Sequence, residues 1–310
     1  RLLSAAAGEL DLRAPRPVVA GAEPAPTRAD LPYHRAGCVV TVDPTDLDRR
    51  DPETLRRLMP SLEFAFDRYF RVALAGAEHL PTGPAIYFGN HCGSTYTVEG
   101  AMLATAIFRR FGVAHPLYFL AHRAFYTLPG VGPWLPKVGA VLADKDVALR
   151  ILARGGQFVV FPGGDRDSHK PFRARHQVDF HGHGGFIRMA LTARVPLIPF
   201  AHVGTHETLY VVSRGDRLAR ALRLHKLAGL NVCPIILSVP FGLTLGPLYP
   251  AIPLPSKISM RVLAPVHLWE LGWDDPDDPA QVAAALAYLT RLVQREVDAL
   301  AAARRWPLLG

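Results

Sequence analysis

Cysteine is scarce in this chain of 310 residues, which carries only Cys38, Cys92 and Cys233. Three widely spaced cysteines cannot build a disulfide framework, and their small number favours a reducing compartment such as the cytoplasm. The chain also lacks the uninterrupted apolar run of roughly 20 residues that a membrane-spanning helix needs. Its longest uncharged run lies between Lys226 and Lys257 and contains six prolines, each of which costs a helix interior about 3 kcal/mol. We therefore predict strands and turns in this proline-rich run, or a surface that enters a bilayer interface.

Acidic residues are outnumbered by basic ones, 27 against 35, which gives a net charge of +8. A basic chain favours anionic partners. An acidic lipid surface or a phosphate-bearing substrate fits better than nucleic acid, because no stretch interleaves basic residues with aromatic ones. We expect a cytoplasmic protein that associates peripherally with a membrane, through helices within residues 45–70 or through the proline-rich run.

The pattern of the chain predicts one α/β domain. Residues 1–32, rich in Ala and Pro, predict a mobile tail, and residues 33–310 a single domain. Short N-terminal helices come first: one ends before Pro60, and another covers Ser61–Tyr69. Apolar strands then alternate with helical segments, which predicts a mostly parallel central sheet flanked by helices. The expected strands are Arg71–Ala75, Ile86–Phe88, Leu117–Leu120, Val138–Leu142, Phe158–Phe161 and Leu197–Val203; the expected helices are Gly100–Arg109, Asp146–Ala153, Gly185–Ala193 and an amphipathic C-terminal helix over 279–304.

A polar pair, Asn90 and His91, directly follows the apolar run Ala85–Gly89. His91 therefore lies where a strand passes into a helix, and the first amides of such a helix favour developing negative charge. An imidazole titrates near ~6.5, so that a neutral histidine can serve as a general base at cytoplasmic pH. Taken alone, a histidine in a loop is more often a capping or packed residue. Other motifs in the chain are therefore needed to distinguish a catalytic His91 from a structural one.

A second block repeats the order of strand, glycine turn and charge. It reads Phe161-Pro-Gly-Gly-Asp-Arg-Asp. Gly163 and Gly164 allow backbone amides to approach a ligand closely, as in a phosphate cradle, although a Gly-Gly pair alone is more often an ordinary loop. Positive charge at the same end of the sheet would come from Arg166, Lys170, Arg173 and Arg175.

Two histidine clusters invite a metal interpretation. They are His181 with His183, and His202 with His206 and Glu207. Neither matches the spacing of a known zinc ligand set, so we expect no metal.

Four blocks in this order resemble the glycerolipid acyltransferase superfamily. They are Asn90-His91 after a strand, Phe161-Pro-Gly-Gly-Asp-Arg-Asp, Gly185-Phe-Ile-Arg-Met-Ala-Leu and Val195-Pro-Leu-Ile-Pro. The Phe-Pro-Gly-Gly form, with Leu245-Gly-Pro-Leu-Tyr-Pro later in the chain, is most similar to the branch of the diacylglycerol acyltransferases and the transmembrane-protein-68-like enzymes. The likeness covers roughly residues 70–270.

The chain departs from the superfamily pattern at two positions. The superfamily places an aspartate five residues after the histidine, where this chain has Tyr96; the nearest carboxylate is Glu99. In one continuous helix, Glu99 would lie about 12 Å along the axis from His91, so the segment between them must loop out for the two to meet. The group that orients His91 is therefore Glu99, Tyr96 or a backbone carbonyl. Gly163 replaces a glutamate of the wider superfamily, and Asp167 is the expected substitute.

The resemblance implies acyl transfer from acyl-CoA or an acyl-carrier protein to the hydroxyl of a lipid, without a covalent intermediate or cofactor. His91 would be the general base and Glu99 its orienting carboxylate. The residues predicted to bind substrate are Asn90, Gly163, Gly164, Arg166, Asp167, Lys170, Arg173 and Arg188. Arg188 could instead pair with Asp167 or Asp179.

Three rival functions remain open at this point. A hydrolase of acyl esters would use the same base with water as the acceptor, and it would need no phosphate cradle. A non-catalytic protein could keep the fold for binding lipid or membrane. A covalent route through Cys92 is disfavoured, because side chains of adjacent residues usually diverge and His91 would be a poor base for its neighbour.

Overall fold

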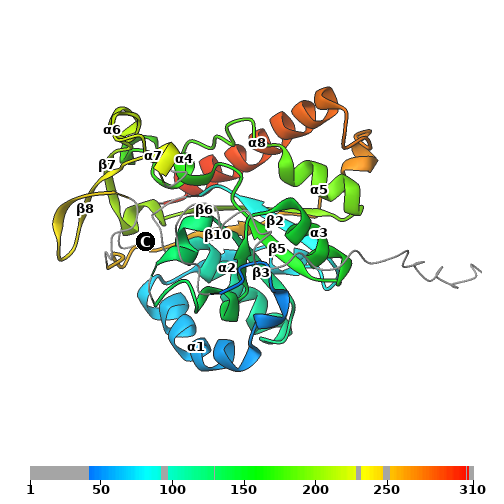
Figure 1. Ribbon diagram of the computed structural model, residues 1–310, viewed down its shortest axis with the longest axis horizontal. Coiled ribbons are helices and arrows are strands. Elements are labelled where there is room, and N and C mark those ends of the chain that lie inside the picture. Colours follow the sequence, from blue (N-terminus) through cyan, green and yellow to red (C-terminus); the bar gives the residue numbers. More distant parts are fainter. Residues whose placement is uncertain are drawn as a thin grey trace, which may run out of the picture. The chain divides into compact units, whose positions relative to one another are not determined.

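The computed structural model describes residues 42–91, 97–128, 130–227, 232–246, 252–304 and 306 (Figure 1). The predicted tail of residues 1–32 lies outside the described residues, as do Cys38, Cys92 and Tyr96. The residues from Val40 onward form one compact unit.

A seven-stranded sheet forms the centre of this unit, with the strand order β1-β10-β6-β2-β5-β3-β4. All neighbouring strands run parallel except β10 and β6, which pair antiparallel. The predicted mostly parallel sheet is therefore confirmed. The strands are β1 (Ala73–Ala75), β2 (Ala85–Gly89), β3 (Leu117–Ala121), β4 (Ala140–Leu142), β5 (Gln157–Val160), β6 (Leu197–Val203) and β10 (Ser259–Val262).

Helices cover both faces of this sheet, with α5 and α8 on one side of it and α1 and α2 on the other (Figure 1). Alternate residues of β2 enter the two cores: Ile86 and Phe88 pack with residues of α3, α5 and α8, and Tyr87 packs with residues of α1 and α2. Burial on both faces explains why the central strands are continuous apolar runs. The helices are α1 (Pro52–Phe64), α2 (Val98–Phe111), α3 (Lys145–Ala153), α4 (Gly164–Ser168), α5 (Gly185–Ala193), α6 (Asp216–Ala221), α7 (Leu224–Leu227) and α8 (Pro279–Ala302).

A separate antiparallel sheet of three strands follows β6 in the chain. Its strands are β7 (Tyr210–Ser213), β8 (Ile235–Ser238) and β9 (Gly242–Leu245), in that order across the sheet. β8 and β9 are the strands that the proline-rich run was predicted to contain. Within the described ranges, no helix is both long and apolar enough to cross a membrane.

The predicted end of a helix before Pro60 is wrong, because α1 continues through Pro60 to Phe64 and is followed by a π-helical turn, Ala65–Tyr69. A proline inside a helix leaves the carbonyl four residues earlier, here that of Arg56, without its donor. Arg56 and Pro60 are both exposed, so water can satisfy that carbonyl. The proline therefore does not end the helix.

Two buried imidazoles lie near the carboxyl end of the sheet. His169 directs Nδ1–H at the carbonyl of Asp165 (3.1 Å), and His206 directs Nε2–H at the carbonyl of Lys170 (2.7 Å). Burial lowers the pKa of His169 to about 4 and that of His206 to about 3. Both side chains are therefore neutral in the folded protein at physiological pH.

We expect Gly89→Ala to destabilise the fold. An added Cβ would lie 2.5 Å from the carbonyl oxygen of Phe200 and 2.9 Å from its ring, inside the pairing of β2 with β6. Overpacking of this kind costs about 1–3 kcal/mol, and chemical denaturation would measure it. Gly83→Ala is the matched control, since nothing lies within 4 Å of a Cβ there; equal stability of the two variants would contradict this account.

Acid should destabilise the protein through its buried imidazoles. As pH falls from about 6.5 towards 4, the unfolded chain takes up a proton at His206 that the folded chain does not, so the free energy of unfolding decreases. The variant His206→Gln, which can keep the Nε2–H donor, should lose about 2 kcal/mol less than the wild type between pH 7 and pH 5. Urea unfolding at both values measures the difference. Between pH 7 and pH 8 the two proteins should respond alike, and a parallel decline below pH 6.5 would refute the assignment.

Candidate active site

His91 lies at the carboxyl edge of the central sheet, two residues beyond the end of β2. β5 is its parallel neighbour and ends beside it in the Phe161–Gly164 turn. The imidazole of His91 stacks on the ring of Phe161, with 4.3 Å between the ring centroids and 16° between the planes. Parallel strands bring their carboxyl ends to one edge, so residues about 70 positions apart in the chain meet here.

Glu99 contacts the imidazole of His91 through a hydrogen bond between its carboxylate and Nδ1. Two local features bring them together: α2 begins only at Val98, and Thr97 before it has a left-handed backbone (φ 41°). The two residues therefore do not share one helix, and the 12 Å separation does not arise. Because a carboxylate only accepts, Nδ1 carries the proton of the neutral imidazole, and the lone pair of Nε2 is left to accept another.

Glu99 is fully buried in the first turn of α2. Burial by itself raises the pKa of this carboxyl group, but the charge of His91, its hydrogen bond and the nearby His202 more than offset that effect. The pKa of Glu99 consequently lies below its ordinary value. The carboxylate is therefore ionised at neutral pH and can stabilise a positive charge on His91.

Asn90 joins the end of β2 to β6. Its side-chain amide donates to the carbonyl of His202 (2.9 Å) and accepts from the backbone N–H of His202 (3.1 Å). The ring of His202 donates from Nε2 to the carbonyl of Asn90 (2.6 Å), and its Nδ1 accepts from Thr205. Burial lowers the pKa of His202, so the ring is neutral. These bonds hold the chain directly before His91; the substrate-binding role of Asn90 stays a prediction.

Asp167 connects the segment after the glycine turn to the backbone of His91. Its carboxylate accepts the backbone N–H of His91 (2.7 Å) and the ammonium of Lys170 (2.7 Å), and it is buried. A Cβ at Gly163 would lie 2.3 Å from the Cβ of Asp167 and 2.8 Å from the carbonyl oxygen of Asp179. Asp167 thus occupies the space that a side chain at position 163 would need, which is why a glycine is required there.

The predicted phosphate-binding residues have different surroundings. Lys170 is buried, and its ammonium contacts Asp167 and the carbonyl of Gln177, so little of it is left for a ligand. Arg166 and Arg173 are exposed, and neither makes a hydrogen bond or ion pair with any described residue. Gly164, with φ +57°, has open space where a Cβ would stand. The accessible positive charge near the turn therefore comes from the two arginines.

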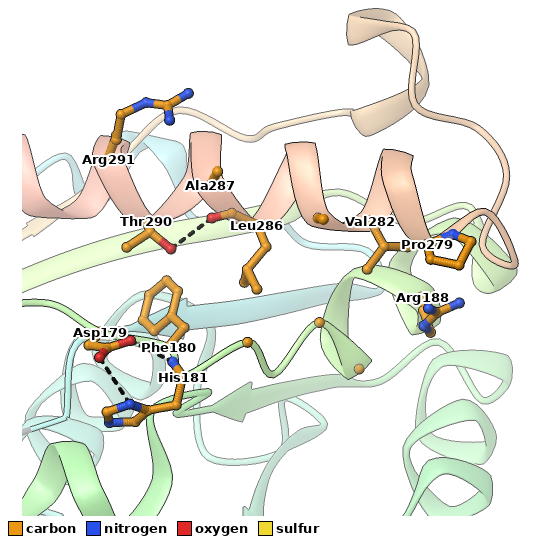
Figure 2. Close-up of a pocket in the computed structure, with 14 residues that line it drawn as sticks. Asp179, Phe180, His181, Arg188, Pro279, Val282, Leu286, Ala287, Thr290 and Arg291 are labelled. Carbon is orange, nitrogen blue, oxygen red and sulfur yellow. Dashed lines mark hydrogen bonds and ion pairs between the residues drawn. The ribbon is translucent and has the colours of Figure 1, made fainter.

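Arg188 lies elsewhere, on α5, beside a cavity of about 470 Å³ (Figure 2). The cavity is bounded by the turn around His181, by the start of α5 and by residues of α8 such as Val282 and Leu286. Arg188 donates to the carbonyl of Pro276, and neither Asp167 nor Asp179 pairs with it in the described structure. His91 is not among the residues that line this cavity. The structure therefore does not bring Arg188 to the His91 turn.

The histidine clusters do not converge. His181 pairs with Asp179 (2.9 Å), and His183 bonds the carbonyl of Pro162 (2.8 Å). His202 and His206 each bond a different backbone carbonyl. Over the ranges that the structure describes, no group of three or more His, Cys, Asp or Glu residues is arranged to hold a metal ion.

Two contributions to the site were not predicted from the sequence. Phe161 was assigned to the end of a strand, although it supports the imidazole face; its place before the Pro-Gly-Gly turn was the available signal. His202 was considered only as a metal ligand, whereas its backbone and ring hold Asn90. No local pattern marks such a role, because the partner lies 112 residues away.

Several known proteins are similar to this chain in sequence. An uncharacterized protein of Mycobacterium leprae is 30% identical over 249 residues, which are 80% of this chain and 65% of the relative. One of Mycobacterium tuberculosis is 30% identical over 247 residues, 79% of this chain and 66% of the relative. The chain thus spans about two thirds of their length. A chicken protein described as a "DGAT1/2-independent enzyme synthesizing storage lipids" is 26% identical over 162 residues, 52% of this chain and 46% of that protein.

A solved structure also matches: the 1-acyl-sn-glycerophosphate acyltransferase PlsC of Thermotoga maritima, with 21% identity and a TM-score of 0.48 over 83% of this chain and 85% of that one. The family model named Acyltransferase matches residues 71–203. This range contains β2, β5, His91, Glu99 and the glycine turn. Residues 71–203 therefore match the acyltransferase family, over the part of the chain that carries the candidate active site.

Proposed function

We propose that this protein transfers a fatty acyl group from a thioester, acyl-CoA or an acyl-carrier protein, to the hydroxyl group of a lipid acceptor. The observation that carries the proposal is the contact of His91 with the buried, ionised Glu99 beside the glycine turn. A relative described as synthesizing storage lipids supports a lipid acceptor. Diacylglycerol, a lysophospholipid, glycerol 3-phosphate and a specialised-metabolite alcohol all offer the required hydroxyl.

In the proposed reaction, Nε2 of His91 takes the hydroxyl proton while the acceptor oxygen attacks the thioester carbonyl. A carbon–oxygen bond forms, the carbon–sulfur bond breaks, and the proton passes from the imidazolium to the leaving thiolate. General base catalysis of this kind is worth about 10²–10⁴-fold. Glu99 would keep the proton on Nδ1 and stabilise the imidazolium. The reaction needs no metal, organic cofactor or acyl-enzyme intermediate.

Charge on the carbonyl oxygen and on phosphate groups would be stabilised by different donors. The amides of His91 and Gly164 already donate to Asp167 and to the carbonyl of Phe161, so the oxyanion has to use other donors. Arg166 and Arg173 are the accessible cations for a phosphate of the donor or acceptor. A hydrolase would not need these two arginines, so their presence favours acyl transfer over hydrolysis.

We also propose a peripheral, cytoplasmic association with the membrane.

His91→Ala should lower the rate of acyl transfer about 10²–10⁴-fold, because the general base is lost. Purified protein would be incubated with labelled acyl-CoA and a panel of lipid alcohols, and the acylated products would be separated and counted. His267→Ala, at the start of the 3₁₀ turn Leu268–Leu271, is the matched control and should keep the wild-type rate. Release of free fatty acid alone would identify a hydrolase, and an undiminished rate in His91→Ala would exclude His91 as the base.

Glu99→Gln should lower kcat strongly while KM stays nearly constant, because Glu99 acts through His91 and does not touch the substrate. A glutamine amide can donate to Nδ1 and so place the imidazole proton on Nε2, the wrong position for a base; loss of up to about 10⁴-fold is known for such a change. Glu99→Asp should restore part of kcat. Steady-state kinetics across pH would test this prediction. An unchanged kcat in Glu99→Gln would show that a group other than Glu99 orients the imidazole of His91.

A further inference from the structure

The outer face of the three-stranded sheet is apolar where a water-facing sheet would be polar. Its side chains alternate: Val211 and Ile236 point inward and are buried. The exposed positions of the same strands are Tyr210, Val212, Leu237, Leu243 and Leu245. Antiparallel sheets with one solvated face normally carry polar residues on it. No charged residue occurs in β7, β8 or β9, so both faces of this sheet are apolar.

These exposed side chains form a continuous surface. The strand register aligns Tyr210 with Leu237 and Leu237 with Leu243. Leu243 is 68% exposed and Leu245 63% exposed. Val239, Phe241 and Ile252 extend the row, so that eight of the fourteen large apolar side chains exposed in the described part of the chain lie here. Apolar patches of this extent mark interaction surfaces.

Cations border the apolar face. The helices α6 and α7 lie between β7 and β8 in the chain, and a Cβ at Gly215, directly before α6, would lie 1.9 Å from the carbonyl oxygen of Cys233, two residues before β8. Four exposed basic residues follow one another along this segment, and none pairs with a described residue: Arg217, Arg220, Arg223 and Lys226. The acidic residue of the segment, Asp216, is already paired with Arg214. The segment of α6 and α7, called the cationic rim below, therefore presents positive charge that no acidic residue of the segment compensates.

We propose that the outer face of β7, β8 and β9, with the basic residues of α6 and α7, docks this protein onto an anionic lipid bilayer. Apolar side chains with adjacent free cations match the acyl boundary and the anionic headgroups of such a surface. The face also leads toward the glycine turn, because Tyr210 stacks on Phe172 at 4.6 Å, and Phe172 follows Lys170 closely in the chain. The proposal deepens the proposed function, since docking would bring a lipid acceptor to the His91 edge.

The helix α1 fits this role less well. Phe66, in the turn that continues α1, is buried in the core, and Leu62 and Tyr69 are partly buried, so that the apolar side chains of the segment Ser61–Tyr69 face largely inward. Phe64 is the large apolar residue of α1 that stays exposed, at 61%. A single side chain offers far less apolar area than the three-stranded sheet.

The test is co-sedimentation of the purified chain with vesicles of phosphatidylglycerol and phosphatidylcholine. The double variant Leu243→Glu/Leu245→Glu should lower vesicle binding about tenfold or more, since two apolar anchors become anions. Leu271→Glu is the matched control, because Leu271 is 46% exposed but ends a 3₁₀ turn beside α5; it should bind as the wild type does. Phe64→Glu should also bind normally. Equal thermal midpoints would show that the variants are folded.

The cationic rim is tested separately. Arg217→Glu/Arg220→Glu should weaken binding to anionic vesicles about tenfold or more and reduce its dependence on salt. Arg295→Glu, an exposed change on α8, is the control. Wild-type binding to vesicles of phosphatidylcholine alone should be weak, and free phosphatidylglycerol headgroup, supplied as glycerol phosphate, should not compete with vesicles.

Three outcomes would overturn the proposal: no vesicle binding by the wild type, unchanged binding by the double leucine variant, or loss caused by Phe64→Glu instead. A wild-type dimer that the leucine changes convert to a monomer, without vesicle binding, would assign the face to a second copy of the chain. His91→Ala should bind vesicles normally. A wild type that docks but transfers no acyl group would contradict the proposed function alone, whereas transfer without docking would contradict this inference alone.

Discussion

The hydrogen bond from the backbone of His91 to the carboxylate of Asp167 joins the two segments on which the site depends. His91 follows the end of β2, and Asp167 lies in the short helix α4 that follows β5. A buried carboxylate is unfavourable unless it is paired and bonded. Lys170 supplies the charge and the amide of His91 supplies a further donor. Asp167, whose charge Lys170 neutralises inside the core, therefore also holds His91 beside the glycine turn.

Each neighbour of the His91 imidazole contacts a different part of the ring. Phe161 covers one face of the ring, Glu99 binds Nδ1, and Nε2 is the atom that the proposed reaction would use. Glu99 is held in the first turn of a buried helix, so its position follows from the packing of α2 against the sheet. The charge of Glu99 is thus placed inside the core, while Arg166 and Arg173 are exposed to solvent. The carboxylate that contacts His91 is therefore shielded from water, and the two cations are accessible to a ligand.

An enzyme that acts on a lipid hydroxyl has to meet a substrate that does not leave the bilayer readily. The small sheet of β7, β8 and β9 buries Val211 and Ile236 on its inner face and also exposes apolar side chains on its outer face, unlike a sheet suited to water. Its exposed leucines would be an aggregation risk without a partner surface. Docking on a bilayer, as we propose, would cover these leucines and would also bring the protein to a lipid acceptor.

The sequence by itself determined the class of fold, because strand and helix periods are local properties. It also placed His91 and the Pro162–Gly164 turn at strand ends, and parallel strands bring such ends to one edge. What it could not supply is which side chains meet across that edge. Glu99 reaches His91 only because α2 begins at Val98, Lys170 is buried because Asp167 needs a counter-ion, and Arg188 lies beside a different cavity. Such outcomes are decided by the tertiary structure: the contact of His91 with Glu99 spans 8 positions and that of Asn90 with His202 spans 112, and both depend on packing and not on local pattern.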